Sequence, residues 1–88
     1  MSRLLELEAV VEVLGNAFRP MSCEASVSGH GQELAFTVFD RDGTPIVTAP
    51  ARPALEMREP YFLRLKIEHV RSFLETEGFK LDPFAPPT

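Results

Sequence analysis

The sequence predicts an α+β fold in the order α-β-β-β-α, in which two helices cover one face of a three-stranded antiparallel meander. Two patterns lead to this prediction. Apolar residues recur every three or four positions near both ends of the chain, as in helices that bury one face. Between these segments apolar and polar residues alternate, as in half-buried strands. We expect one compact domain over residues 1–81 and a flexible, proline-rich tail over residues 82–88.

The first segment is predicted to be a helix over residues 3–18. Ser2 can cap its start, because a serine side chain accepts a hydrogen bond from the free N–H groups of the first turn. Pro20 ends it, because the residue before a proline is disfavoured in helical geometry. The apolar positions that share one face of this helix are Leu4, Leu7, Val11, Leu14 and Phe18.

Two strands joined by a four-residue loop are predicted between Ser22 and Phe39. The alternating apolar residues are Cys23, Ala25 and Val27 on the first strand, and Leu34, Phe36 and Val38 on the second. A loop over residues 29–32 places the two apolar sets directly opposite each other, Cys23 with Val38 at one end and Val27 with Leu34 at the other. A three-residue loop would turn one set to water.

A turn and a third strand follow. Asp40 and Gly43 suit a type I turn with a bulge, since the glycine takes the position of positive φ. The strand over residues 44–49 contains Pro45, which has no N–H to donate, so we place it at the edge of the sheet. Its inward face is open between two pairs, Ile46 with Thr48 or Val47 with Ala49.

The second helix is predicted to begin near Pro60, after a proline-rich connector with a short helical turn at Ala54–Arg58. Gly78 is expected to cap its C-terminus. Its buried stripe consists of Leu63, Ile67, Val70 and Leu74. Two ion pairs are expected on its outer face, Arg64 with Glu68 and Arg71 with Glu75.

Charge and composition argue against several classes of partner. The formal net charge is −4, whereas an RNA or DNA binder needs clustered lysine and arginine. The α-β-β-β-α order is shared with double-stranded-RNA-binding domains, but the stretch "EMREPYFLRLK" replaces the basic cluster that this family carries at the start of its second helix. No segment is apolar enough to span a bilayer, and a single cysteine cannot form an internal disulfide. We therefore expect a cytoplasmic protein with no membrane or nucleic-acid partner.

No catalytic, cofactor or metal site is expected, so the protein is predicted not to be an enzyme. Cys23 lies on the core face of its strand, with no basic residue on that face to lower its pKa. His30 is at the tip of the hairpin and His69 lies beside the buried stripe, and neither has a partner in the sequence. Asp40 and Asp42 begin a stretch, "DRDG", that lacks the ligand spacing of a calcium loop.

The run "AFRPMSCEASV" (Ala17–Val27), preceded by "LLELEAVVEVL", resembles the N-terminal half of a family of small pseudomonad proteins defined only as a domain of unknown function. The positions that carry the resemblance are Glu6, Leu7, Phe18, Pro20 and Cys23. It covers about half of the chain and implies a bacterial protein in which a helix, a strand hairpin and a final helix follow one another. Some members have a second cysteine where this chain has Ala25, which argues against a redox or metal role here. The resemblance implies no activity.

The function predicted from these observations is a small, non-catalytic protein–protein interaction or regulatory module, whose unknown partner includes a second copy as a candidate. The candidate contact residues are Glu24, Thr37 and Phe39 on the open sheet face, Ile46 and Val47 on the third strand, Tyr61 and Phe62 on the second helix, and Phe84 in the tail. The alternative is a small-ligand-binding module with a pocket between the second helix and the sheet, lined by Phe36, Phe62 and Phe73. Binding of double-stranded RNA is the third and weakest reading.

Overall fold

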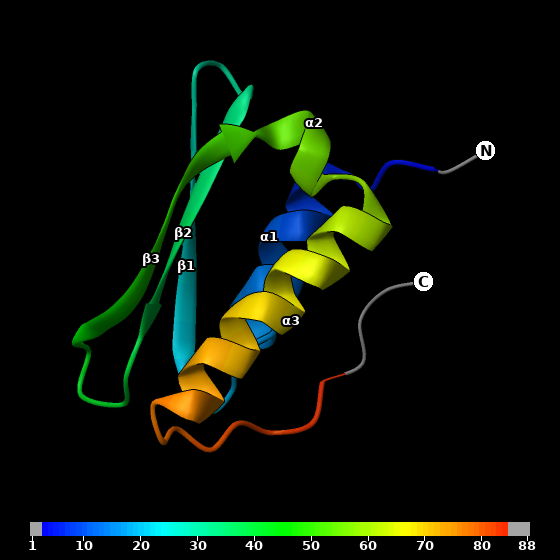
Figure 1. Ribbon diagram of the computed structural model, residues 1–88. Coiled ribbons are helices and arrows are strands. Elements are labelled where there is room, and N and C mark those ends of the chain that lie inside the picture. The colour runs from blue at the N-terminus through cyan, green and yellow to red at the C-terminus, as the bar shows by residue number, and fades with distance from the viewer. Residues whose placement is uncertain (1–2, 85–88) are drawn as a thin grey trace.

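The computed structural model describes residues 3–84 and confirms the predicted α+β fold. Its elements are α1 (Leu7–Asn16), β1 (Ser22–Ser28), β2 (Glu33–Phe39), β3 (Pro45–Pro53), α2 (Ala54–Met57) and α3 (Pro60–Thr76). The three strands form one antiparallel sheet in the order β1-β2-β3. Figure 1 shows this sheet as one layer and the helices together as a second layer on one of its faces. The other face of the sheet is left open.

The β1–β2 hairpin has the predicted register. Cys23 pairs with Val38 and Val27 pairs with Leu34, so both apolar sets face the helices. The loop between the strands takes up residues 29–32, three of which have positive φ. Two of these three are glycines, which adopt this region without steric cost.

The β2–β3 turn also follows the sequence prediction. The carboxylate of Asp40 accepts hydrogen bonds from the backbone N–H groups of Asp42 and Thr44, each at 2.9 Å. Gly43 has a φ of +85° and donates its N–H to the carbonyl of Asp40. The turn is therefore held by the side chain of Asp40, the residue that begins it.

The strand β3 is longer than predicted, and its inward face is now defined. It extends to Pro53 because β2 continues to pair with it as far as Glu33. Val47 and Ala49 are the inward pair, since they lie opposite the core-facing residues of β2. Ile46 also contacts the core, because a register shift beside it bends the strand.

The helix α1 begins later than predicted, and its buried face is only partly the predicted one, since Leu7, Leu14 and Phe18 contact the core as predicted but Leu4 and Val11 are exposed. The chain before Leu7 is held extended, because the N–H of Leu5 donates to the carbonyl of Arg58 at 2.7 Å and the Arg58 guanidinium donates to the carbonyl of Leu5 at 2.6 Å. The predicted cap, Ser2, lies outside the described residues. Val10 is buried and Val11 is 37% exposed, the reverse of the prediction. The predicted spacing counted Phe18 as helical, whereas α1 ends at Asn16.

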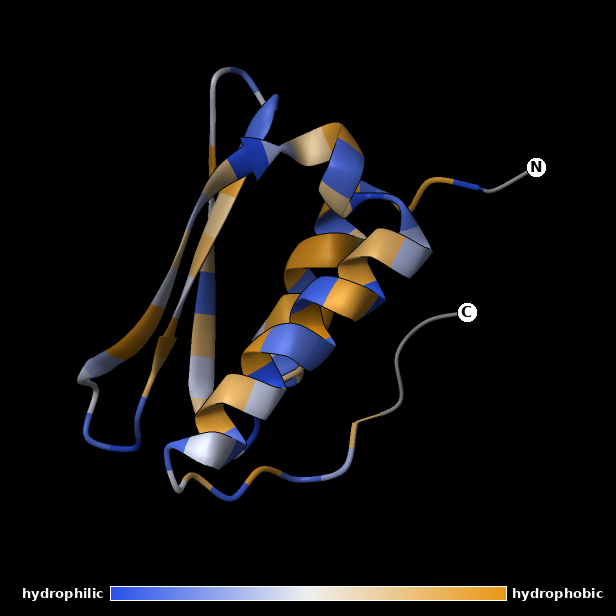
Figure 2. Cartoon of the chain, viewed as in Figure 1, coloured by the Kyte–Doolittle hydropathy of each residue, from blue (hydrophilic) through white to orange (hydrophobic). Residues whose placement is uncertain are grey.

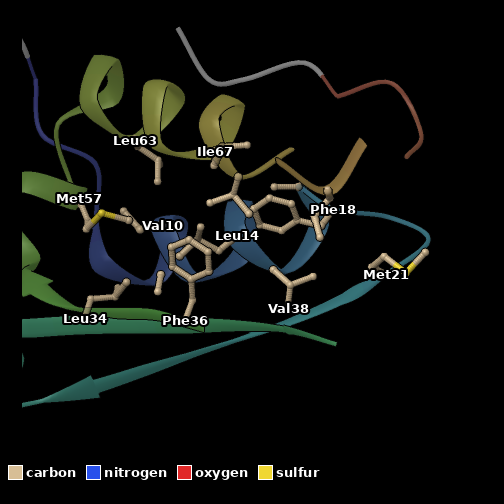
Figure 3. Packing of buried hydrophobic residues seen from close by; sticks show 14 of the residues in the cluster. Val10, Leu14, Phe18, Met21, Leu34, Phe36, Val38, Met57, Leu63 and Ile67 are labelled. Atoms are coloured by element: carbon tan, nitrogen blue, oxygen red, sulfur yellow. The ribbon is translucent and has the colours of Figure 1, made fainter. Parts of the chain in front are cut away.

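A single apolar core fills the space between the sheet and the helices, as Figure 3 shows. Phe18 and Phe36 stack at its centre, with ring centroids 6.0 Å apart. The predicted stripe of α3 is confirmed, and it is made of Leu63, Ile67, Val70 and Leu74. Figure 2 shows how apolar and polar residues alternate along these elements. No polar or charged residue is buried within residues 3–84.

The helix α3 ends in the predicted glycine cap. Gly78 has a φ of +98° and donates its N–H to the carbonyl of Glu75, while the N–H of Phe79 donates to the carbonyl of Leu74, each at 3.0 Å. These two bonds define a Schellman motif. On its outer face Arg64 lies 3.7 Å from Glu68, as predicted.

Arg71 makes different contacts from the predicted pair with Glu75. Its guanidinium donates to the carbonyls of Ala17 and Asp82, each at 2.6 Å, and lies 5.8 Å from the ring centroid of Phe84. The N–H of Asp82 in turn donates to the carbonyl of Arg19 at 2.7 Å. Asp82 is therefore attached to Arg19, which follows α1, and to Arg71 of α3, and Phe84 also lies against Arg71. Residues 85–88 lie outside the described residues.

We expect Arg71→Ala to lower the free energy of unfolding by about 2 kcal/mol, because the part-buried carbonyl of Ala17 loses a charged donor. Urea denaturation followed by circular dichroism measures this change. Arg41→Ala is the control, since Arg41 is exposed in the β2–β3 turn and its removal should cost less than about 0.5 kcal/mol. Equal losses in the two variants would show that Arg71 does not hold these segments together.

Candidate functional site

Three of the predicted contact residues lie on the open face of the sheet. Glu24 on β1 pairs with Thr37 on β2, and Phe39 lies two residues further along the same face. Their neighbours on this face are small or polar, namely Ser22, Ser26, Ala35 and Thr48. One half-buried aromatic ring among hydroxyl groups does not amount to an apolar patch.

The two predicted contact residues on β3 do not lie on a free surface of their own. Ile46 and Val47 are both half-buried against the core. Val47 also lines an open groove of about 250 Å³ between β3 and α3, which carries the side chains of Lys66, His69 and Phe73.

The predicted ligand pocket is not assembled from its three phenylalanines. Phe36 is 2% exposed and belongs to the core. Phe73 lies on the groove beside β3, whereas Phe62 lies near the other end of α3 in a separate groove. No single cavity among the described residues is lined by all three.

Tyr61 and Phe62 lie in a groove that is lined almost entirely by apolar side chains and has a volume of about 520 Å³. We call it the α2–α3 groove, and its apolar residues are Leu4, Leu55, Tyr61, Phe62 and Leu65. Leu55 is 62% exposed, Tyr61 60% and Leu65 44%. This is the part of the described surface where large exposed apolar side chains from three separate segments meet.

Local structure explains why these side chains point outward. In α2 the core takes Ala54 and Met57, which leaves Leu55 on the opposite side. In α3, Tyr61 and Leu65 are four residues apart and share a face that lies off the buried stripe. Leu4 is brought to the groove by the hydrogen bonds between Leu5 and Arg58 described above.

The start of α3 fixes the floor of the groove. A Glu59 carboxylate oxygen accepts a hydrogen bond from the N–H of Phe62 at 2.7 Å, which caps the helix, and Pro60 occupies its first position. The guanidinium of Arg64 lies 5.3 Å from the ring centroid of Tyr61, a cation–π distance that holds this ring against the helix.

The rim of the groove is acidic. Its polar lining residues are Glu56 and Glu59. Glu56 is paired with Arg52 at 3.0 Å, an exposed ion pair that salt screens. The carboxylate of Glu59 caps α3 and so lies at the positive end of the helix dipole.

The sequence analysis named Tyr61 and Phe62 as candidate contact residues but did not name Leu55 or Leu65, and it placed Leu4 on the buried face of the first helix. The sequence contained one signal for Leu65. This leucine is apolar but lies two residues before Ile67, a spacing that places it off the buried stripe of the helix. An apolar residue off the buried face of a helix is a candidate for a contact surface.

Cys23 and the two histidines lie apart from one another in the described part of the chain. The thiol of Cys23 is half-buried, and burial together with the nearby charge of Glu24 raises its pKa to about 12. His30 and His69 are exposed and lie on different elements, the hairpin loop and α3. Among residues 3–84, no group of three or more His, Cys, Asp or Glu side chains is placed to hold a metal ion.

Comparison of this chain with protein-family models, curated proteins and solved structures finds no match. The resemblance of Ala17–Val27 to the pseudomonad family therefore stays a prediction. In the part of the chain that the structure describes, no helix is long and apolar enough to cross a bilayer.

Proposed function

We propose that the protein is a small, non-catalytic protein–protein interaction module, and that the α2–α3 groove binds a short apolar segment of its partner. The observation that carries the proposal is the joint exposure of Leu55, Tyr61 and Leu65 around one groove. Each large apolar side chain that passes from water into an interface contributes on the order of 1.5–3 kcal/mol. Aromatic residues such as Tyr61 are also enriched at the centres of interfaces.

The chemistry of the groove favours a protein segment over a small ligand. A small-molecule site encloses its ligand and presents a few converging polar groups that orient it. Here the groove is open, and its polar residues are the two glutamates on the rim. The carboxylates of both glutamates already have partners, Arg52 for Glu56 and the N–H of Phe62 for Glu59, so an apolar segment complements the surface that the groove presents.

Selection of peptides displayed on phage against the immobilised protein tests this proposal. We expect enrichment of sequences with clustered large apolar residues. Titration of a selected peptide into ¹⁵N-labelled protein should shift the amide signals of Leu55, Tyr61 and Leu65 rather than those of the sheet.

The matched variants are Leu65→Glu and Ser72→Glu, which add the same charge to exposed positions of α3 inside and outside the groove. We expect Leu65→Glu to weaken peptide binding at least about tenfold, since it places a charge in an apolar contact, and Ser72→Glu to leave it unchanged. Equal affinities in the two variants, or shifts confined to the sheet, would refute the groove as the binding surface.

The single half-buried thiol is compatible with a reducing compartment such as the bacterial cytoplasm. Location and bacterial origin are part of this proposal and rest on cysteine usage and on the pseudomonad resemblance.

A further inference from the structure

The sheet has a second edge, the strand β1, in addition to the predicted edge β3. In antiparallel strands, alternate residues point their N–H and C=O groups away from the neighbouring strand, so an edge strand presents them to solvent. Within residues 3–84, the backbone of Ser22–Ser28 makes no hydrogen bond beyond its ladder with β2. The free side of β1 is therefore an open template for another strand.

The two edges differ in how well they are protected against pairing. β3 contains Pro45, Pro50 and Pro53, which cannot donate, and its register with β2 shifts at two places. β1 contains no proline, and all seven of its residues pair with β2 without interruption. Prolines and bulges are the usual means of blocking edge-to-edge pairing, and only β3 has them.

A groove of about 470 Å³ runs along the β1 edge. Its walls extend around this edge. On the core side they include Val11 and Gly15 of α1 together with Cys23 and Ala25 of β1, and on the open face they include Glu24, Ser26, Thr37 and Phe39. Val11 is exposed, and Val27, on β1 itself, is 41% exposed although it lies on the core face of the strand. The core side of this edge is thus apolar and incompletely covered by its own chain.

We propose that β1 pairs antiparallel with β1 of a second copy, about a two-fold axis that passes beside Ala25. Ala25 is the midpoint of Ser22–Ser28, so this is the register that pairs all seven residues. The two three-stranded sheets then form one continuous sheet, with the helices of both copies on the same side. The proposal goes beyond the interaction function proposed above, because it uses none of the residues of the α2–α3 groove.

This register is complementary on both faces of the sheet, because residues opposite each other in a pair share a face. On the core face, Cys23 lies opposite Val27 of the partner subunit, which covers the exposed valine. On the open face, Glu24 lies opposite Ser26 of the partner subunit. A register centred one residue earlier would instead oppose two Glu24 carboxylates. In this register each residue of β1 lies opposite a compatible residue of a second β1. For this reason the partner that we propose for this edge is a second copy of the chain.

Sedimentation equilibrium of the full chain over a range of concentrations tests the dimer. Ser26→Glu places a carboxylate opposite Glu24 of the partner subunit in two symmetric contacts, and we expect the association constant to fall about tenfold. Ser26→Lys places an ammonium there, and we expect the constant to rise about tenfold. Ser26 is exposed on the open face, and circular dichroism verifies that both variants fold.

The control variants are Thr48→Glu and Thr48→Lys, which make the same changes on the open face of β3. We expect neither to alter the association constant. A wild-type chain that stays monomeric at millimolar concentration overturns the proposal. The proposal is also overturned if both Ser26 variants change the association constant in the same direction, or if the Thr48 variants change it as much as the Ser26 variants do. Peptide binding at the α2–α3 groove is measured on the same proteins. A chain that binds peptide but stays monomeric refutes the dimer alone, and a chain that dimerises but binds no peptide refutes only the proposed function.

Disulfide trapping tests the register. Val27→Cys places a thiol opposite Cys23 of the partner subunit, whereas positions 23 and 27 of one strand are about 13 Å apart and cannot be bridged. With copper–phenanthroline as catalyst, the two thiols lose two protons and two electrons to dissolved oxygen and form an interchain S–S bond. We expect a covalent dimer on a non-reducing gel. Ser28→Cys, whose thiol would lie opposite Ser22 of the partner subunit, is expected to give little. Equal trapping in both variants overturns the proposed register.

Discussion

Phe36→Ala is expected to lower the free energy of unfolding by about 3–5 kcal/mol, the usual cost of truncating a buried aromatic residue. Phe36 lies on the central strand, stacks on Phe18 and is enclosed by the sheet and the helices (Figure 3). Removal of its ring leaves a cavity between the sheet and the helices, both of which pack against it. Because small domains are stable by only about 5–15 kcal/mol, this one change removes a large share of the total.

Urea denaturation followed by circular dichroism measures this loss. The matched control is Phe39→Ala on the same strand, whose half-buried ring lies on the open face and should cost less than about 1.5 kcal/mol. Phe36→Leu keeps most of the buried volume and provides an intermediate loss if the alanine variant does not fold. A loss in Phe39→Ala as large as that in Phe36→Ala would mean that the core is not on the helix side of the sheet.

At pH 8, the thiol of Cys23 is expected to react with Ellman's reagent about a thousandfold more slowly in the native protein than in the unfolded chain. Only the thiolate attacks the reagent. Burial, and to a lesser extent the charge of Glu24, raises the pKa of this thiol from 9.0 to about 12. The native thiolate fraction at pH 8 then falls by about three orders of magnitude.

The same difference in pKa makes stability depend on pH. The unfolded chain releases the thiol proton near pH 9 and the folded chain near pH 12, so the unfolded state binds fewer protons between these values. The stability that depends on this group is therefore present below pH 9 and is lost as the pH rises from 9 to 12. Cys23→Ser should remove this part of the pH dependence. A native thiol that reacts as fast as the thiol in urea would show that Cys23 is not covered.

The features that the sequence predicts correctly depend on neighbouring residues. Alternation on both sides of a loop defines the pairing of Cys23 with Val38, because a slip of one residue would turn an apolar set to water. Asp40 and Gly78 act within five residues of themselves, as a turn side chain and a helix cap. For such features the local sequence contains the whole interaction.

The predictions that were wrong depend on partners far along the chain. The bond from the Arg58 guanidinium to Leu5 spans 53 residues, and the bond from Arg71 to Ala17 spans 54. The first holds the segment before α1 extended, and the second takes Arg71 away from its helical neighbour Glu75. Periodicity within one helix contains no information about either contact.

The candidate surfaces were predictable only in part. Tyr61 and Phe62 could be proposed from the sequence, but the groove exists because Leu4 and Leu55 arrive from two other segments. For the sheet, Pro45 led to the prediction that β3 is an edge strand. A meander of three strands has two edges, so β1 followed from the predicted topology as soon as the strands were placed in order.

The two long-range attachments have a consequence for the order in which the protein forms during synthesis. The sheet needs only residues up to Pro53, and each of its strands pairs with the next one along the chain. The attachment of α1 requires Arg58 and Arg71, and the bond between Arg19 and Asp82 requires nearly the whole chain. The strands of the meander can therefore pair as soon as residues 22–53 have been synthesised, whereas the helices can close over the sheet only after the segments with Arg58, Arg71 and Asp82 have followed.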